Sequence, residues 1–146
     1  MSAVEQELQE LIEAFFRSVS FERGAGPQYG AIRALFVDKG MLIRNSGGAP
    51  EIALVEEFIT SRQALFASGE LEMFSETEAS AITELYGGVA HRWSTYDKAG
   101  VSGGVAFAAR GLISTQFVRT PVGWRMTSMA WDDESPDNPV PPRYLP

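Results

Sequence analysis

The spacing of the apolar residues changes once, near Leu71, and this change constrains the fold more than any other feature of the sequence. Before Leu71, apolar residues recur at intervals of three and four, which is typical of amphipathic helices. After it, apolar and polar residues alternate, and β-branched and aromatic types become common, which indicates antiparallel strands. The sequence therefore predicts an α+β chain with its helices first and its sheet afterwards.

Three helices and one short strand are predicted in the first half. The first helix covers residues 2–22 and opens on an S-x-x-E capping box. A second, short helix lies within residues 27–40, where proline can open it and glycine can end it. A strand over 41–45 follows. The third helix begins near Pro50 and ends at a glycine, Gly69.

Four antiparallel strands are predicted in the second half, near residues 71–85, 88–97, 110–119 and 123–133. Turns rich in Gly and Pro separate them, and residues 97–100 are expected to form the middle one. A bulge at Gly123 would set the register of the last hairpin. That register pairs Thr120 with Trp124, Phe117 with Thr127, Thr115 with Met129, and Ile113 with Trp131.

Both faces of this last hairpin lack the charged surface that a sheet open to water shows on one side. Val118 and Met126 are expected on one face, together with small polar residues. We therefore expect one face to cover the helices and the outer face to form a homodimer.

Length and composition exclude several classes of function. The 146 residues suffice for one domain, predicted over 1–133, and residues 134–146 hold five of the eight prolines in a tail expected to lie outside the core. The net charge of -7 repels phosphate and anionic lipid, so neither nucleic acid nor membrane is an expected partner. The sequence contains no cysteine and one histidine, so we predict no metal site and no cofactor. It shows no leader and no membrane span, and a cytoplasmic location is expected.

Four segments carry a resemblance to a known family: FFRSVSF, ALFVDKGMLI, GGVAHRWSTYD and QFVRTPVGWRMTSMAWDDE. With the order of elements over residues 4–133, they resemble the nuclear transport factor 2-like superfamily, specifically its SnoaL-like members. The resemblance implies a cystatin-like fold, in which a cone-shaped, curved antiparallel sheet wraps around three N-terminal helices. It also implies a pocket closed at one end and dimerisation through the outer sheet face. The superfamily includes isomerases, dehydratases, polyketide cyclases and oligomerisation domains, so the fold alone does not fix a function.

Two residues are candidates for acid or base catalysis. His91 is the only side chain with an ordinary pKa near neutrality, and its alternative role is a hydrogen-bonded histidine on the sheet surface or in a dimer interface. Asp38 lies where the second helix gives way to a strand. The resemblance implies an aspartate as acid or base, although a turn or capping role is the alternative for Asp38.

Arg62 is unusual because it falls on the apolar stripe of the third helix, next to Leu65 and Phe66. A guanidinium there needs a route to solvent, a carboxylate, or a ligand with an anionic or carbonyl group. We expect it at the cavity mouth, with a ligand shared by His91, Tyr29 or Asp38. The aromatic residues expected to contact that ligand are Tyr29, Phe15, Phe16, Phe58, Trp93, Phe117 and Trp131.

Two further charged groups are expected at the surface. Arg92 is predicted to be solvated or in the dimer interface, and Asp132, Asp133 and Glu134 to form a solvated acidic end. Three functions remain open: a cofactor-free lyase, isomerase or cyclase acting on an apolar, ring-containing carbonyl compound; a binding module for such a small molecule; or a dimerisation domain whose pocket is filled.

Overall fold

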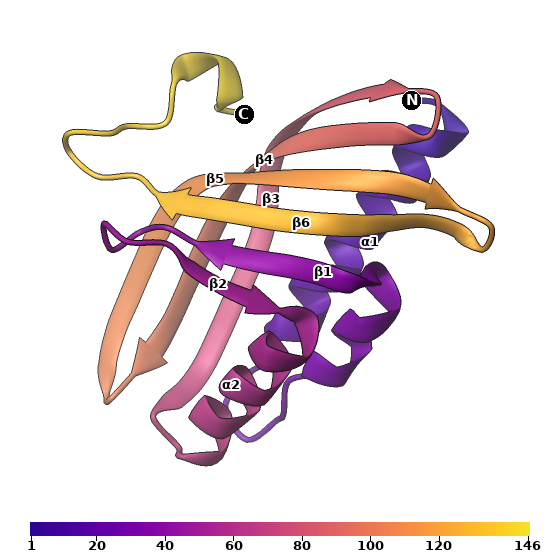
Figure 1. The fold of residues 1–146 in the computed structure, drawn as a ribbon. Coiled ribbons are helices and arrows are strands. Elements are labelled where there is room, and N and C mark those ends of the chain that lie inside the picture. Colours follow the sequence, from indigo (N-terminus) through magenta and orange to yellow (C-terminus); the bar gives the residue numbers. More distant parts are fainter.

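Helix α1 (Ala3–Val19) begins as its capping box predicts, because the Ser2 hydroxyl accepts a hydrogen bond from the Glu5 amide. The structure is a computed structural model that describes residues 1–146. Figure 1 shows α1 and the other long helix on the concave side of a strongly curved sheet. The remaining elements are η1 (Tyr29–Leu35), β1 (Phe36–Arg44), β2 (Glu51–Leu54), α2 (Val55–Ala67), β3 (Leu71–Tyr86), β4 (Val89–Ser102), β5 (Val105–Thr120), β6 (Gly123–Asp133) and η2 (Pro142–Tyr144).

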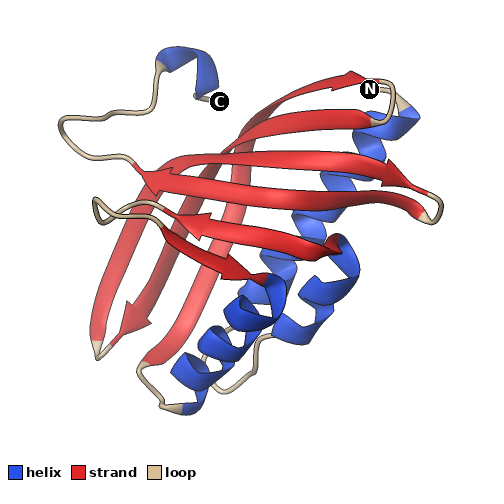
Figure 2. Ribbon diagram, in the orientation of Figure 1, coloured by secondary structure: helices blue, strands red, loops and turns tan.

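The six strands form one open sheet in the order β2-β1-β6-β5-β4-β3, and Figure 2 shows that it is the larger of the two layers. All neighbours are antiparallel except β1 and β6, which are parallel. The expectation of a wholly antiparallel sheet is therefore corrected to a mixed one. The fold class itself, an α+β cone, is confirmed. No helix is long and apolar enough to cross a membrane.

The first half differs from prediction at two places. The second helix is a 3-10 helix that ends at Leu35, and the chain is already extended from Phe36 onward. The third helix begins at Val55 rather than near Pro50, because residues 51–54 pair with β1 as the edge strand β2. A four-residue edge strand has too few residues to show a period in the sequence.

The β4–β5 turn lies at Gly103 and Gly104, not at residues 97–100 as predicted. Both glycines have positive φ, 57° and 78°, as a two-residue hairpin turn requires. Strands β4 and β5 are consequently longer than expected, and residues near their turn share a cavity lining with residues of α2.

The last hairpin keeps half of its predicted register. Thr115 lies opposite Met129 and Ile113 opposite Trp131, as expected. Phe117, however, pairs with Met126 rather than Thr127, and Thr120 pairs with Gly123 rather than Trp124. The register shifts at Thr127 instead of Gly123, and this turns Met126 into the core, where it is fully buried.

The core lies between the concave face of the sheet and the helices. It is built around these buried side chains: Leu8, Ile12, Phe15, Ile32, Leu42, Phe58, Ile59, Tyr96, Ile113, Phe117, Met126 and Met129. The tail packs outside this core cluster, on the opposite face of the sheet. Tyr144 is buried on the outer face of the sheet, where its carbonyl accepts hydrogen bonds from Ser80 and Thr95.

Candidate functional site

A cavity of about 430 Å³ lies between the helices and the concave face of the sheet. This volume is in the range of small-molecule sites. Its walls are mainly apolar, with side chains from α1, α2 and three of the strands: Phe15, Phe58, Phe74, Phe107, Ile113, Met129 and Trp131. Six ionisable groups interrupt these walls: Tyr29, Arg44, Arg62, Glu76, Lys98 and Asp133.

Five of the predicted ligand-contacting residues do line this cavity: Arg62, Tyr29, Phe15, Phe58 and Trp131. Phe16 and Phe117 are buried in the surrounding core and do not line it. Trp93 lies on the outer face of the sheet, where its ring centroid is 5.7 Å from that of Tyr144. The structure therefore brings together the predicted residues from η1 and α2, but not all those from the strands.

Neither predicted catalytic residue lies at the cavity. His91 is on the outer face, half exposed, with Nε2 2.9 Å from the Oε1 atom of Glu84 on the neighbouring strand. Odd-numbered residues of β4 near His91 face away from the helices, so His91 does not line this cavity. Asp38 is exposed on β1 and is likewise absent from the cavity lining.

Arg62 reaches the cavity from α2 and forms no ion pair with a carboxylate. Its guanidinium carbon lies 4.8 Å from the ring centroid of Phe58, a cation-π contact. Burial lowers the pKa of Arg62, and the positive charge of Arg44 lowers it further. Tyr29 is 3% exposed, and burial raises the pKa of its hydroxyl while the nearby Arg62 opposes that rise.

Glu76 reaches the cavity from β3, directly across from Lys98 on β4. Its carboxyl group accepts no hydrogen bond and lies outside ion-pair distance of every basic side chain. Burial raises the pKa of Glu76 to about 7, although Lys98 and Arg62 act in the opposite direction. This carboxyl can therefore gain or lose a proton near neutral pH.

Lys98 and Asp133 form a second polar group beside Glu76. The Nζ atom of Lys98 is 2.9 Å from the Oδ1 atom of Asp133, and the Tyr96 hydroxyl donates to the same oxygen. Gly111 lies between the strands that carry Tyr96 and Asp133, and a Cβ there would overlap the Tyr96 hydroxyl. Burial and the Asp133 carboxylate raise the pKa of Tyr96, which keeps its phenol protonated.

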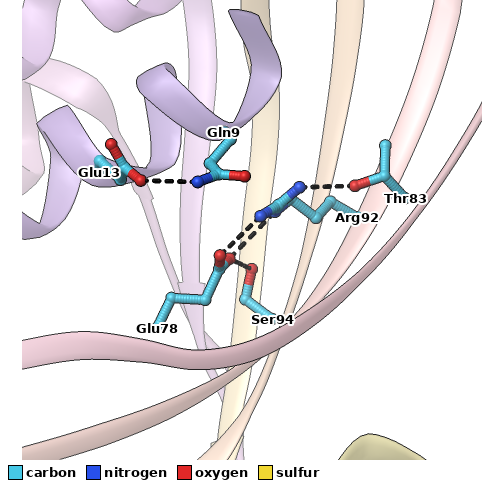
Figure 3. A network of polar contacts seen from close by, with 6 residues as sticks. All are labelled: Gln9, Glu13, Glu78, Thr83, Arg92 and Ser94. Atoms are coloured by element: carbon cyan, nitrogen blue, oxygen red, sulfur yellow. Dashed lines mark hydrogen bonds and ion pairs between the residues drawn. The ribbon is translucent and has the colours of Figure 1, made fainter. Parts of the chain in front are cut away.

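Arg92 was predicted to lie at the surface. It lies instead in a buried network on the concave face of the sheet (Figure 3). Its guanidinium donates to both carboxylate oxygens of Glu78, at 3.0 and 2.6 Å, and to the Thr83 hydroxyl at 2.7 Å. Ser94 donates to Glu78 as well, at 2.6 Å. Because every partner is satisfied, this network has the character of a structural ion pair rather than a ligand site.

Sequence reasoning missed Glu76, Lys98 and Asp133 as site residues. Lys98 was missed because residues 97–100 were predicted to form a turn. For Glu76 the cause is a register shift in β3, where Ala79 has no partner on β4, between the pairs Glu78–Tyr96 and Ser80–Thr95. Regular alternation from the β3–β4 turn would place Glu76 on the outer face. Asp133 was missed because it belongs to a run of acidic residues at 132–134 that was predicted to be solvated. Only the register of β5 with β6 shows that Asp133 faces inward.

The comparisons with known proteins agree with this architecture. A protein from Kribbella flavida has a TM-score of 0.76 at 15% identity over 90% of this chain and 91% of its own. A nuclear transport factor 2-like superfamily protein from Salmonella enterica has a TM-score of 0.74 at 15% identity, with coverages of 90% and 92%. A nuclear transport factor 2-like protein with a cystatin-like fold from Novosphingobium aromaticivorans has a TM-score of 0.66 at 19% identity, with coverages of 92% and 86%. No family model and no curated protein sequence matches the chain.

The chain therefore has the nuclear transport factor 2-like, cystatin-like fold, as the resemblance implied. At these identities the similarity defines the fold and leaves the activity to be argued from the cavity.

Proposed function

We propose that this protein binds a small carbonyl compound in the cavity and catalyses proton transfer at the carbon next to the carbonyl. The observation that carries the proposal is Glu76, a carboxyl group without a hydrogen-bond or ion-pair partner that lines an apolar cavity and has a pKa of about 7. A general base works best when its pKa is close to the working pH. The reaction class is one that the SnoaL-like resemblance also implies.

The proposed step uses three side chains. The Glu76 carboxylate takes a proton from the carbon, and the electrons of the C–H bond form a C=C bond while the carbonyl oxygen becomes an enolate. The Lys98 ammonium, opposite Glu76, donates a hydrogen bond to that oxygen and offsets its charge. Asp133 accepts from Lys98 at 2.9 Å and so fixes the direction of the ammonium group. Return of the proton to the same carbon or to a conjugated one completes an exchange or an isomerisation.

The walls of the cavity favour an apolar, ring-containing substrate. Phe15, Phe58 and Trp131 belong to a set of aromatic contacts, and the Phe58 and Trp131 rings meet edge to face with centroids 6.4 Å apart. Phe74 and Phe107 line the cavity from the long strands. Such walls surround the carboxyl with apolar side chains and provide surface for a flat hydrocarbon body.

Deuterium uptake by ketones tests the proposal. In D2O, the wild-type protein should accelerate α-proton exchange of cyclohexanone, 1-indanone or 2-tetralone, followed by proton NMR, by about 100-fold over buffer. The rate should rise with pH through about 7, since the ionised form of Glu76 is the base.

Two variants complete this experiment. Glu76→Gln should reduce exchange to the rate in buffer, whereas Glu84→Gln, which changes an exposed carboxyl on the outer face, should retain the wild-type rate. Ketones that bind the wild-type protein without faster exchange would instead indicate a binding module. Equal rates for wild type and Glu76→Gln would remove Glu76 from the reaction.

A further inference from the structure

We propose that the natural ligand carries a carboxylate, bound by Arg62 and Tyr29 at the helical side of the cavity. This inference rests on the proposed function and extends it, because it names the substrate class as an apolar carbonyl compound with a carboxylate group. Its basis is a set of hydrogen-bond donors that face one cavity without an acceptor from the chain.

Arg62 is the central group of this set. It is the one cavity-lining arginine or lysine without a carboxylate partner, since Arg44 pairs with Glu51 and Lys98 with Asp133. Its contact with the Phe58 ring, 4.8 Å from the guanidinium carbon to the ring centroid, places the guanidinium against one wall of the cavity. A guanidinium presents paired donors that match the two oxygens of a carboxylate.

Tyr29 supplies a second donor. Its side chain is 3% exposed, and its hydroxyl lines the cavity without a hydrogen-bond partner from the chain. The chain leaves this hydroxyl free to donate to a molecule in the cavity, close to the unpaired Arg62.

Arg44 adds positive charge at the cavity mouth. It is 47% exposed, and its pairing with Glu51 is loose, at 3.8 Å. Arg44 repels Arg62, and an anion between or beside the two would relieve that repulsion. Arg62 and Tyr29 come from α2 and η1, whereas Glu76, Lys98 and Asp133 come from strands, so the unpaired donors and the proton-transfer carboxyl belong to different walls of the cavity.

A pair of isosteres tests the inference. 2-Naphthoate and 2-naphthamide have the same ring and nearly the same shape, and only the first is an anion. We expect naphthoate to bind the wild-type protein at least tenfold more tightly than naphthamide by isothermal titration calorimetry at pH 8. Arg62→Met should remove this preference, and Tyr29→Phe should weaken naphthoate binding about threefold.

Arg33→Met is the matched control. Arg33 is exposed on η1 and pairs with Glu56 outside the cavity, so its removal should leave the preference for naphthoate unchanged. Thermal unfolding of the ligand-free protein gives a second measurement. Arg62→Met should unfold at the wild-type temperature or above it, because it removes a buried charge that lacks a partner.

Three results would overturn the inference. The first is equal binding of the two isosteres, including binding of neither, and the second is a preference for naphthoate that survives Arg62→Met. The third is a large loss of stability in Arg62→Met, which would identify a structural arginine. These outcomes are separable from the proposed function. Naphthoate preference without ketone exchange would leave an anion-binding module, and exchange without naphthoate preference would leave an enzyme for neutral carbonyl compounds.

Discussion

The carboxyl of Glu76 has opposite effects on function and on stability. Burial raises its pKa from the ordinary 4.5 to about 7, which suits a base working near neutrality. The same burial makes the ionised form unfavourable in the folded protein. Between pH 4.5 and 7 the folded state therefore holds a proton that the unfolded state has already lost, and stability falls as pH rises through this range.

This linkage predicts a pH-dependent effect of Glu76→Gln. The variant should have wild-type stability near pH 4.5 and exceed it at pH 8 by up to about 3 kcal/mol, since the neutral amide loses no proton. Urea unfolding at a series of pH values measures the difference. The control Glu84→Gln should follow the wild-type curve, and a Glu76→Gln curve parallel to wild type would contradict the shifted pKa.

For single residues, the sequence predicted which face of a helix a side chain occupies, but not which face of the sheet a strand residue occupies. Arg62 could be assigned to the cavity because a helical stripe is read directly from spacings of three and four in the sequence. His91 could not be assigned to a face, because alternation along a strand leaves open which side meets the helices. Glu76 was hidden for the further reason that the register of β3 shifts between it and the nearest turn.

Among the elements, the four long strands were predictable and the connections that set their register were less so. The start of β3 at Leu71 and the span of β6 agree with the sequence pattern. Strand β2 and the parallel pairing of β1 with β6 depend on contacts between distant segments, which local periodicity does not encode.

The Arg92 network, which lies beneath α1, stabilises the pairing of strand β3 with strand β4 (Figure 3). Arg92→Met should destabilise the protein by about 3–5 kcal/mol, because Glu78 would remain buried without its cation. Urea unfolding measures the loss. The double variant Arg92→Met with Glu78→Met should recover a large part of it, since neither charge then remains.

Arg110→Met is the comparison for this prediction. Arg110 and Asp97 form a similar bidentate pair across the next two strands, β5 and β4, but at the surface, with side chains 31% and 47% exposed. Its loss should cost less than about 1 kcal/mol. Similar costs for the two arginine variants would contradict a structural role for the Arg92 network.

At the scale of the whole molecule, the tail covers part of the outer sheet face. Tyr144 packs against Trp93 and accepts hydrogen bonds from Ser80 and Thr95, so this part of β3 and β4 is already occupied. The outer face near the β3–β4 turn remains open, with Val89 54% exposed and paired across the sheet with Val118. A homodimer through the outer face stays a prediction, now restricted to this uncovered region.

Light scattering at micromolar concentration measures the assembly directly. We expect a molar mass of twice the 16.0 kDa of the chain. Val89→Asp should give the monomer mass, because it places a charge in the uncovered apolar region, while Val122→Asp in the exposed β5–β6 turn should leave the dimer intact. A wild-type mass near that of one chain would contradict the dimer.

The unpaired Ala79 in β3 also affects how this sheet can tolerate changes in chain length. In a regular strand, losing one residue turns every side chain beyond it to the opposite face. Loss of Ala79 instead removes the bulge and leaves Glu78 beside Ser80, with both still opposite Tyr96 and Thr95. A one-codon deletion at this position would therefore preserve the inward-facing carboxyl of Glu76. Homologous genes can differ in length here and still encode the same cavity.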